Sequence, residues 1–210
     1  MDTGSLYERQ DAISDRSLER YRARFGDSVT ADDVFHYVYG IVNSPEYGTR
    51  FAAELGKMIP RLPKVDAFWE FVQAGQRLAE LHVGYESVEP WPLDGLPGPE
   101  AETRQLRVEQ MRFAGGARNP DRSAIVVNEW VTLSGIPEEV YRYEVNGRSA
   151  LAWLLDRYRV RVDKDSGIRN DPNSWSHDPR YVVDLVAKVV RVAVESAAII
   201  GELPSLGLPR

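Results

Sequence analysis

The 210 residues are 43% hydrophobic and include five Trp and ten Tyr, enough to bury one large core or two small ones. Cysteine is absent, which excludes disulfides and thiolate metal sites, and three scattered histidines argue against a zinc site. The net charge of −6 argues against a protein that coats DNA, because nonspecific affinity comes from Lys and Arg that neutralise phosphates. No basic region with an apolar run follows Met1, and no apolar stretch reaches the roughly 18 residues of a membrane span. We therefore expect a cytoplasmic protein without a membrane partner.

The first 85 residues carry helical patterns throughout. Ser5 to Arg24 is a polar segment with an apolar stripe, and Gly26 follows it as glycine follows many helices. A second helix begins at the capping box Thr30-Ala-Asp-Asp33. A third begins at Ser44-Pro45 and runs to Pro60, and a fourth runs from Asp66 to about Tyr85.

Beyond residue 86 the pattern changes. Residues 87–100 contain four prolines and two glycines, so neither a helix nor a central strand persists there, and we place a linker over this segment. Short alternating or β-branched runs follow, at Leu106–Phe113, Ala124–Asn128, Trp130–Ser134 and Val140–Val145. After them come a short helix, a polar loop and a closing helix, at Ser149–Arg157, Ser166–His177 and Pro179–Ile200.

These patterns predict an α+β fold. An N-terminal helical bundle region over residues 1–86 is followed by the linker over 87–100 and by an α+β domain over 101–210. That domain holds a small, mostly antiparallel sheet with flanking helices and a long C-terminal helix.

Catalytic motifs are missing from the sequence. There is no Gly-x4-Gly-Lys-Ser/Thr phosphate loop. Ser44-Pro-Glu-Tyr47 only approximates the Asn/Asp-Pro-Pro-aromatic run that holds a flipped adenine, and Phe113-Ala-Gly-Gly-Ala117 only approximates a glycine-rich cofactor loop. His36 and His82 lie in apolar helical patterns typical of core or boundary histidines, with no nucleophile motif nearby. We therefore predict no catalytic residue, no cofactor and no metal, and an independent enzyme is the least favoured class.

Several short motifs resemble a known family by their order. They are Tyr37-Val-Tyr-Gly40, Ser44-Pro-Glu-Tyr47, Glu89-Pro-Trp-Pro-Leu93, Leu133-Ser-Gly-Ile-Pro137 and Asn146-Gly-Arg-Ser-Ala-Leu-Ala-Trp153. This order resembles the C-terminal target-recognition (specificity) region of Type ISP restriction-modification enzymes. Those enzymes are single polypeptides that combine a nuclease, a helicase-type ATPase, a coupling region, an adenine-N6 methyltransferase and a target-recognition domain.

The resemblance implies a reader of DNA sequence that is not itself a catalyst. Residues 101–210 would be the target-recognition domain. The implied partners are double-stranded DNA and the methyltransferase and helicase regions of the same polypeptide. Tyr143 to Arg157 also resembles a strand and helix near the end of many methyltransferase recognition domains, which implies that Leu151, Trp153, Leu154 and Tyr158 are core residues.

Direct readout of DNA needs side chains with paired donors or acceptors, chiefly Arg for guanine and Asn or Gln for adenine. The Arg112–Arg122 loop offers four candidates on a glycine turn: Arg112, Arg118, Asn119 and Arg122. The polar segment Lys164–Trp175 offers six: Lys164, Ser166, Arg169, Asn170, Asn173 and Trp175. Arg148 stands at a predicted helix N-terminus, where it either holds a phosphate or donates a structural hydrogen bond. For the loop candidates the alternative is a turn residue without a ligand.

A second function class stays open beside DNA recognition. The acidic net charge and the helical first 85 residues also fit a protein-interaction or coupling module that binds no DNA alone. A positive groove formed by the two polar loops favours DNA recognition, whereas charge scattered without a groove favours the coupling module.

Overall fold

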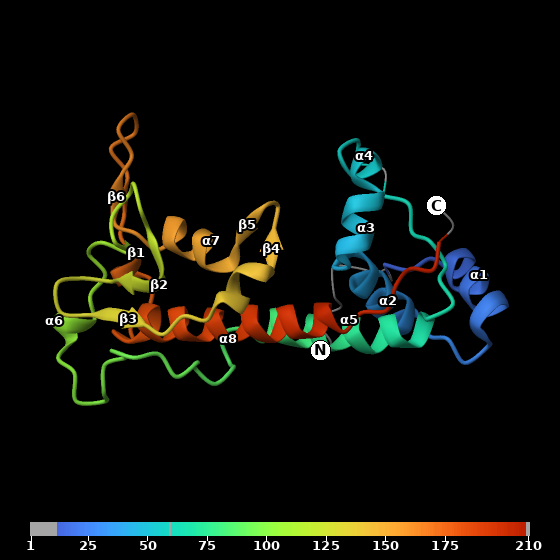
Figure 1. The fold of residues 1–210 in the computed structure, drawn as a ribbon, viewed down its shortest axis with the longest axis horizontal. Helices are drawn as coiled ribbons and strands as arrows, with labels where there is room; N and C mark the ends of the chain where they lie inside the picture. The colour runs from blue at the N-terminus through green and yellow to red at the C-terminus, as the bar shows by residue number, and fades with distance from the viewer. Residues whose placement is uncertain (1–11, 59, 209–210) are drawn as a thin grey trace, which may run out of the picture. The chain divides into compact units, whose positions relative to one another are not determined.

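The computed structural model describes residues 12–58 and 60–208, and it divides into two compact units (Figure 1). The first unit contains Met1–Glu80 together with Ile199–Arg210, and the second contains Leu81–Ala198. Helices and small antiparallel sheets make up the chain, so the predicted α+β class with a long C-terminal helix is confirmed. The assignment of residues 1–86, 87–100 and 101–210 to separate functional parts stays a prediction.

The first unit is helical. Its helices are α1 Asp15–Phe25, α2 Ala31–Val42, α3 Pro45–Arg50, α4 Ala52–Leu55 and α5 Phe68–Val83, the last of which extends three residues into the second unit. The predicted capping box of α2 is confirmed, because Thr30 accepts from the Asp33 amide while Asp33 accepts from the Thr30 amide. The predicted helix start at Ser5 lies outside the described residues.

The single helix predicted from Ser44 to Pro60 is wrong. Two short helices replace it, because Phe51 leaves the helical conformation (φ −105°, ψ 20°) and packs its ring 4.9 Å from that of Tyr47. Gly48 and Thr49, just before the break, are weak helix formers, so the low local helix propensity permits the helix to end there.

Two glycines set the packing of α2 on α5 within the first unit. A Cβ on Gly75 would stand 1.8 Å from the His36 carbonyl oxygen, and one on Gly40 would stand 2.4 Å from the Phe71 carbonyl oxygen. The two backbones therefore approach as closely as glycine permits. Around this contact lies a core that includes Tyr37, Phe68 and Phe71, all at most 1% exposed.

The C-terminal tail also packs into the first unit. Leu206 is 2% exposed in the same core, and its amide donates to the Glu46 carboxylate at 2.9 Å. Arg50 donates to the Leu208 carbonyl oxygen at 3.2 Å. The end of the chain thus belongs to the unit that its beginning forms.

The second unit combines small sheets with helices. A three-stranded antiparallel sheet has the order β1-β2-β3, and two two-stranded ribbons pair β4 with β5 and β6 with β7. The strands are β1 Arg112–Ala114, β2 Asp121–Val126, β3 Thr132–Ser134, β4 Glu144–Val145, β5 Arg148–Ser149, β6 Arg161–Val162 and β7 Arg169–Asn170. The helices are α6 Thr103–Leu106, α7 Ala150–Arg157 and α8 Tyr181–Gly201, whose last three residues belong to the first unit. Two 3-10 turns, η1 Glu138–Arg142 and η2 Pro172–Ser174, complete the unit.

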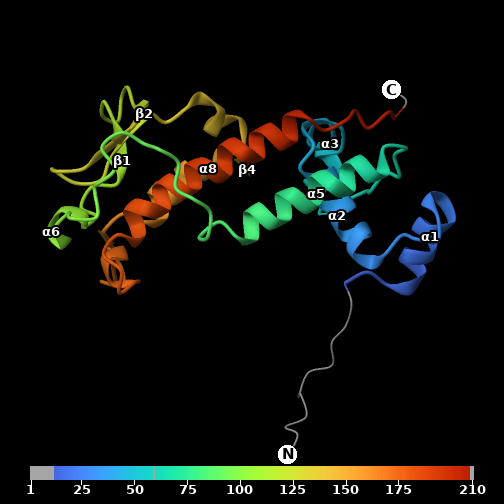
Figure 2. The ribbon, with the colours of Figure 1, turned by 90° about the horizontal axis from the view of Figure 1, so that it is seen from below.

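One core joins these elements. Ile125 and Leu133 of the sheet, Leu151 of α7 and Val186 of α8 are fully buried in a single cluster. Figures 1 and 2 show the sheet near the N-terminal half of α8. The valines of α8 therefore pack as a helical face, as the absence of a turn signal over this segment predicts.

Two predicted strands are mostly wrong. Leu106 to Phe113 forms a strand only from Arg112, because Leu106, Val108 and Met111 instead turn into the core and Met111 takes a left-handed φ of 48°. Val140 to Val145 is mainly the turn η1, which buries Val140. In both segments an irregular backbone, not a strand, buries the apolar side chains. An alternating apolar pattern is therefore not sufficient to predict a strand.

The Pro/Gly-rich segment 87–100 packs within the second unit. The Trp91 amide donates to the Ala187 carbonyl oxygen at 3.1 Å, and the Arg180 guanidinium donates to the carbonyl oxygens of Pro97 and Gly98. Leu93 is 6% exposed. The segment forms neither a helix nor a named strand, as its prolines predict, and it lies against α8.

Of the four residues that were predicted to be core residues of α7 and its flank, three lie in the core or at the edge of the core. Leu151 and Leu154 are buried and Tyr158 is half-buried, which confirms the first two. Trp153 is 44% exposed, so its assignment to the core is wrong. Its ring lies under the Arg148 guanidinium at 4.3 Å and its indole N–H donates to the Val145 carbonyl oxygen at 3.1 Å.

Candidate nucleic-acid interface

The loop between β1 and β2 presents the most accessible candidates. Gly115 and Gly116 have φ of 73° and 89°, a left-handed conformation that lets the chain turn sharply after β1. A Cβ on Gly115 would stand 2.5 Å from the Asn119 carbonyl oxygen, so the loop closes tightly on itself. The side chains of Arg118 and Asn119 are exposed and make no hydrogen bond, ion pair or ring contact with any described residue.

The same hairpin is fixed at its base. Asp121 accepts from the Ser123 amide at 2.9 Å and from the Ser123 hydroxyl at 2.7 Å, and these hydrogen bonds lower the pKa of the Asp121 carboxyl. The Arg122 guanidinium lies 5.0 Å from the Tyr141 ring, and the Tyr141 hydroxyl donates to the Arg122 carbonyl oxygen at 2.6 Å. Arg112 donates to Gln110 and to the Phe113 carbonyl oxygen.

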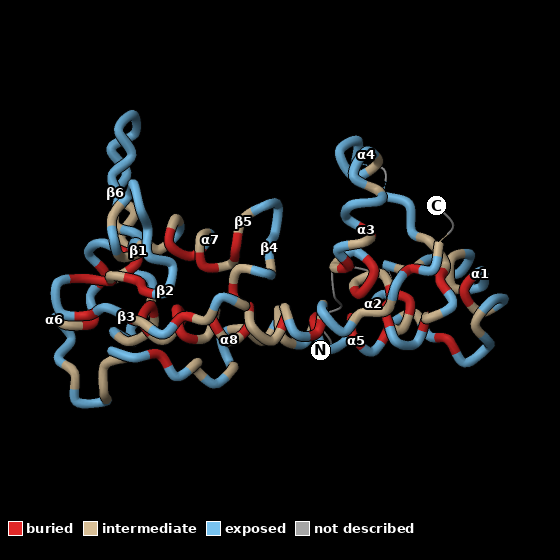
Figure 3. The backbone as a smooth tube through the Cα atoms, in the orientation of Figure 1, coloured by how far each residue is buried: buried red, intermediate tan, exposed pale blue. Residues whose placement is uncertain are grey.

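The β6–β7 hairpin carries the second set of candidates and is exposed along its length (Figure 3). Asp163 shapes its tip by accepting from the amides of Asp165 and Ser166 and from the Ser166 hydroxyl, and the bonds from Ser166 lower the pKa of the Asp163 carboxyl. The Asn170 amide donates to the carbonyl oxygens of Arg157 and Arg159. Lys164, at the tip, is exposed and has no partner among the described residues.

The residues after β7 are tied to the fold. Asn173 accepts from the Val108 amide at 2.7 Å and donates to the Val108 carbonyl oxygen at 3.0 Å. Arg169 pairs with Asp171 at 3.2 Å. Trp175, which is 41% exposed, packs edge-on against Tyr158 and lies 5.3 Å from the Arg157 guanidinium.

Arg148 stands at the end of β5, beside the α7 N-cap Ser149. Its guanidinium turns along the helix, donates to the Ala152 carbonyl oxygen at 3.0 Å and approaches Asp156 at 3.9 Å. Asp156 also pairs with Arg159 at 2.9 Å. Arg148 is therefore a structural donor whose side chain is still 40% exposed.

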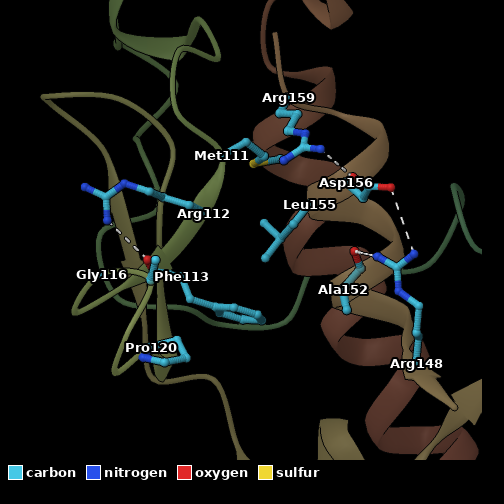
Figure 4. A pocket seen from close by; sticks show the side chains of 11 residues that line it. Met111, Arg112, Phe113, Gly116, Pro120, Arg148, Ala152, Leu155, Asp156 and Arg159 are labelled. Carbon is cyan, nitrogen blue, oxygen red and sulfur yellow. Dashed lines mark hydrogen bonds and ion pairs between the residues drawn. The ribbon is translucent and has the colours of Figure 1, made fainter. Parts of the chain in front are cut away.

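A cavity of about 350 Å³ lies between the β1–β2 hairpin and α7 (Figure 4). Met111, Phe113, Pro120, Ala152 and Leu155 give it mainly apolar walls, and Arg148, Asp156 and Arg159 stand at its edge. A second hollow of about 540 Å³ is lined by Arg122, Tyr141 and Arg142, among others.

Positive charge is concentrated on one of the two hairpins. Residues 112–122 carry three arginines and one aspartate, whereas residues 161–171 carry three basic and three acidic side chains. Both hairpins lie on the same side of α8 (Figure 1). Among residues 12–58 and 60–208, no group of three His, Cys, Asp or Glu side chains fits a metal ion, and no helix is long and apolar enough to cross a membrane.

A comparison with protein-family models decides the family. The model that describes the Type ISP C-terminal specificity domain matches residues 2–185, most of the chain. The chain belongs to this family. The resemblance predicted from the ordered motifs is thereby confirmed.

Solved structures of related enzymes match this specificity domain over most of its length. The ATP-dependent Type ISP restriction-modification enzyme LlaBIII bound to DNA is 32% identical over 100% of the chain, with a TM-score of 0.84. A nuclease-deletion mutant of the Type ISP enzyme LlaGI with a DNA substrate mimic is 36% identical over 85%, with a TM-score of 0.73. The DrdV–DNA complex is 32% identical over 92%, with a TM-score of 0.76. A comparison with curated proteins gives no match.

The specificity domain spans only 13%, 14% and 20% of those three enzymes. Sequence reasoning found its exposed loop residues but missed Arg159 and the cavity. The Arg157-Tyr-Arg159-Val-Arg161 alternation was the available signal, yet only the fold brings Arg159 opposite the β1–β2 hairpin.

Proposed function

We propose that this specificity domain reads a DNA sequence for a larger restriction-modification enzyme, and that the β1–β2 loop is the reading element. The observation that carries the proposal is the adjacent pair Arg118 and Asn119, exposed and without a partner in the described part of the chain. Arginine pairs with the two acceptors of guanine, and asparagine with the donor and acceptor of adenine. The glycine turn and the Asp121–Ser123 bonds hold this pair in register.

Electrostatics support this assignment. The Asp121 carboxylate accepts two hydrogen bonds from Ser123. The hairpin keeps an excess of positive charge because residues 112–122 carry three arginines against this one aspartate. On a chain with a negative net charge, a positive hairpin is the site at which attraction for DNA phosphates is concentrated. The hairpin is therefore the part of the surface that attracts DNA most strongly.

The other candidates have supporting roles in this proposal. We assign phosphate contacts to Arg112, Arg122, Lys164 and Arg169, whose charged ends are exposed, and a stacking or sugar contact to Trp175. Ser166, Asn170 and Asn173 use their polar atoms to hold the β6–β7 hairpin and the Asp171 turn, so they position the contacts. Arg148 reaches DNA only with the part of its guanidinium that α7 leaves exposed.

The comparisons supply the context of the proposal. The three solved relatives are described as bound to DNA or to a DNA mimic, and two of them as Type ISP restriction-modification enzymes. We propose that methylation, ATP-driven translocation and cleavage belong to other regions of a longer, cytoplasmic polypeptide, whose methyltransferase and helicase regions are the protein partners of this domain. The domain itself then catalyses nothing.

One observation favours the second candidate, a coupling module. Phe35 and Val42, seven residues apart on α2, are 46% and 44% exposed, and Val162 and Ile168 on the β6–β7 hairpin are 58% and 69% exposed. Exposed apolar side chains that form a contiguous patch mark protein contact sites. Such contacts are compatible with DNA reading, because a specificity domain must also be held by its enzyme.

Selection from a randomised duplex pool at two salt concentrations separates the two functions. DNA recognition predicts an enriched motif whose retention falls as salt rises, because phosphate contacts release counterions. The coupling module predicts no enrichment at either salt concentration, together with binding to a methyltransferase region of a Type ISP enzyme. That second result would contradict autonomous reading by this chain.

A further inference from the structure

The cavity between the β1–β2 hairpin and α7 is called the slot below. Phe113 from β1 and Leu155 from α7 point toward each other across it, and Met111, Pro120 and Ala152 complete the walls (Figure 4). Its volume of about 350 Å³ lies at the lower end of the roughly 300–1,000 Å³ of small-molecule sites. A whole duplex is far too large for this volume, whereas a single planar group such as one base fits.

Guanidinium groups stand at one edge of the slot. Arg148 and Arg159 flank the Asp156 carboxylate, at 3.9 and 2.9 Å, so two positive charges face one negative charge. The Arg148 and Arg159 side chains remain partly exposed, at 40% and 48%. Arg112 also lines the slot, but its guanidinium donates to the Phe113 carbonyl oxygen and lies away from the apolar walls (Figure 4). The edge therefore attracts an anion beside an apolar, partly aromatic interior.

A nucleotide combines these two properties. Its base stacks on aromatic and apolar side chains, and its phosphate suits arginine. An apolar side chain of a protein would fill the walls but leave the arginine edge unused. Charge complementarity therefore favours a nucleotide over a protein segment.

We propose that the slot takes a single unstacked deoxynucleotide of the bound DNA, with its base against Phe113 and Leu155 and its phosphate at Arg148 and Arg159. This inference rests on the proposed DNA recognition. The slot adjoins the reading loop, because Gly116 and Ala117 line it directly before Arg118. One base thus leaves the stack next to the bases that the loop reads, and the domain senses how easily that base pair opens.

A base-deletion cycle tests the proposal on the complete 210-residue chain. After selection has identified a target duplex, abasic nucleotides replace each position in turn, and affinities are measured for the wild type and Phe113→Ala. At one position we expect Phe113→Ala to weaken binding about 5- to 150-fold on the intact duplex but hardly at all on the abasic one, as loss of base–aromatic stacking predicts. Equal weakening on intact and abasic DNA at every position would mean that Phe113 is structural, and would overturn the proposal.

Two further variants guard against misfolding of the hairpin. Ala152→Leu fills the slot from the opposite wall with a good helix former, and it should abolish the same position-dependent difference. The double variant Arg148→Gln and Arg159→Gln should lower the slope of log affinity against log salt by about 1, for one phosphate. The matched control is Arg77→Gln, because the Arg77 side chain is 58% exposed and pairs with Glu202. This variant should leave the slope unchanged.

Fluorescence of 2-aminopurine gives an independent readout. At the position found by the cycle, the probe should brighten when the wild type binds and stay quenched with Ala152→Leu. Binding without brightening at any position contradicts the unstacked nucleotide while leaving DNA recognition intact. Absence of all duplex binding contradicts DNA recognition itself, and the nucleotide site with it.

Discussion

Asn128 connects three segments of the second unit, and its removal should be costly. The side chain is 1% exposed. Its amide donates to the carbonyl oxygens of Gln105 and Arg107, each at 2.7 Å, and its oxygen accepts from the amides of Trp130 and Val131 at 2.9 and 2.7 Å. Asn128→Ala removes all four bonds at once and leaves four backbone groups without this partner.

The expected loss of unfolding free energy follows from those bonds. At about 1 kcal/mol for each hydrogen bond, Asn128→Ala costs about 4 kcal/mol, a large share of the roughly 5–15 kcal/mol of a typical domain. Asn119→Ala is the matched control, because the Asn119 side chain is exposed and makes no hydrogen bond with a described residue. Its stability should change by less than about 0.5 kcal/mol.

Urea denaturation followed by tryptophan fluorescence measures both variants. Trp130, two residues from Asn128, reports on the second unit directly. A loss below about 1 kcal/mol for Asn128→Ala, or an equal loss for Asn119→Ala, would refute the view that this buried amide joins the loop to α6.

Three further predictions concern the other contacts of the fold. Gly75→Ala should lower the free energy of unfolding, measured by thermal denaturation, by about 3 kcal/mol, because the new Cβ would stand 1.8 Å from a carbonyl oxygen of α2. The control Gly48→Ala, whose Cβ would have nothing within 4 Å, should be neutral or stabilising. Leu206→Ala should lower the urea midpoint by the equivalent of about 2–5 kcal/mol, since that side chain is 2% exposed, and an unchanged midpoint would place the tail outside the core. His82 lies 2.9 Å from the Ser196 hydroxyl, and burial lowers the pKa of its imidazole. As the pH falls, the imidazole is therefore protonated in the unfolded chain before it is protonated in the folded one. The free energy of unfolding should then decrease as the pH drops below 6.5. His82→Gln should flatten that pH dependence, and an unchanged slope would contradict the neutral buried imidazole.

Much of the fold follows from local signals in the sequence. The Thr30–Asp33 capping box and the apolar faces of α2, α5 and α8 are visible in sequence because each depends on residues three or four apart. Asn146-Gly147 also marks its hairpin locally, with left-handed φ of 53° and 71° at the two turn residues. Signals of this kind do not depend on distant parts of the chain.

Other features depend on contacts that local patterns do not reveal. Met111 leaves the strand pattern because the amides of Glu109 and Gln110 donate to Val127, a pairing that no local pattern reveals. Trp153 is 44% exposed, and its ring lies against the Arg148 guanidinium instead of the core. The cavity was missed for the same reason, since its walls come from residues 111–120 and 148–159.

The most direct test of DNA reading by the β1–β2 loop compares the motifs that the wild type, Arg118→Ala and Asn119→Ala select from one randomised duplex pool. We predict that each variant loses preference at one guanine or adenine position, at a cost of about 1–3 kcal/mol, while the rest of the motif and the salt dependence stay nearly unchanged. Motifs identical to that of the wild type in both variants would contradict the claim that this loop reads the sequence.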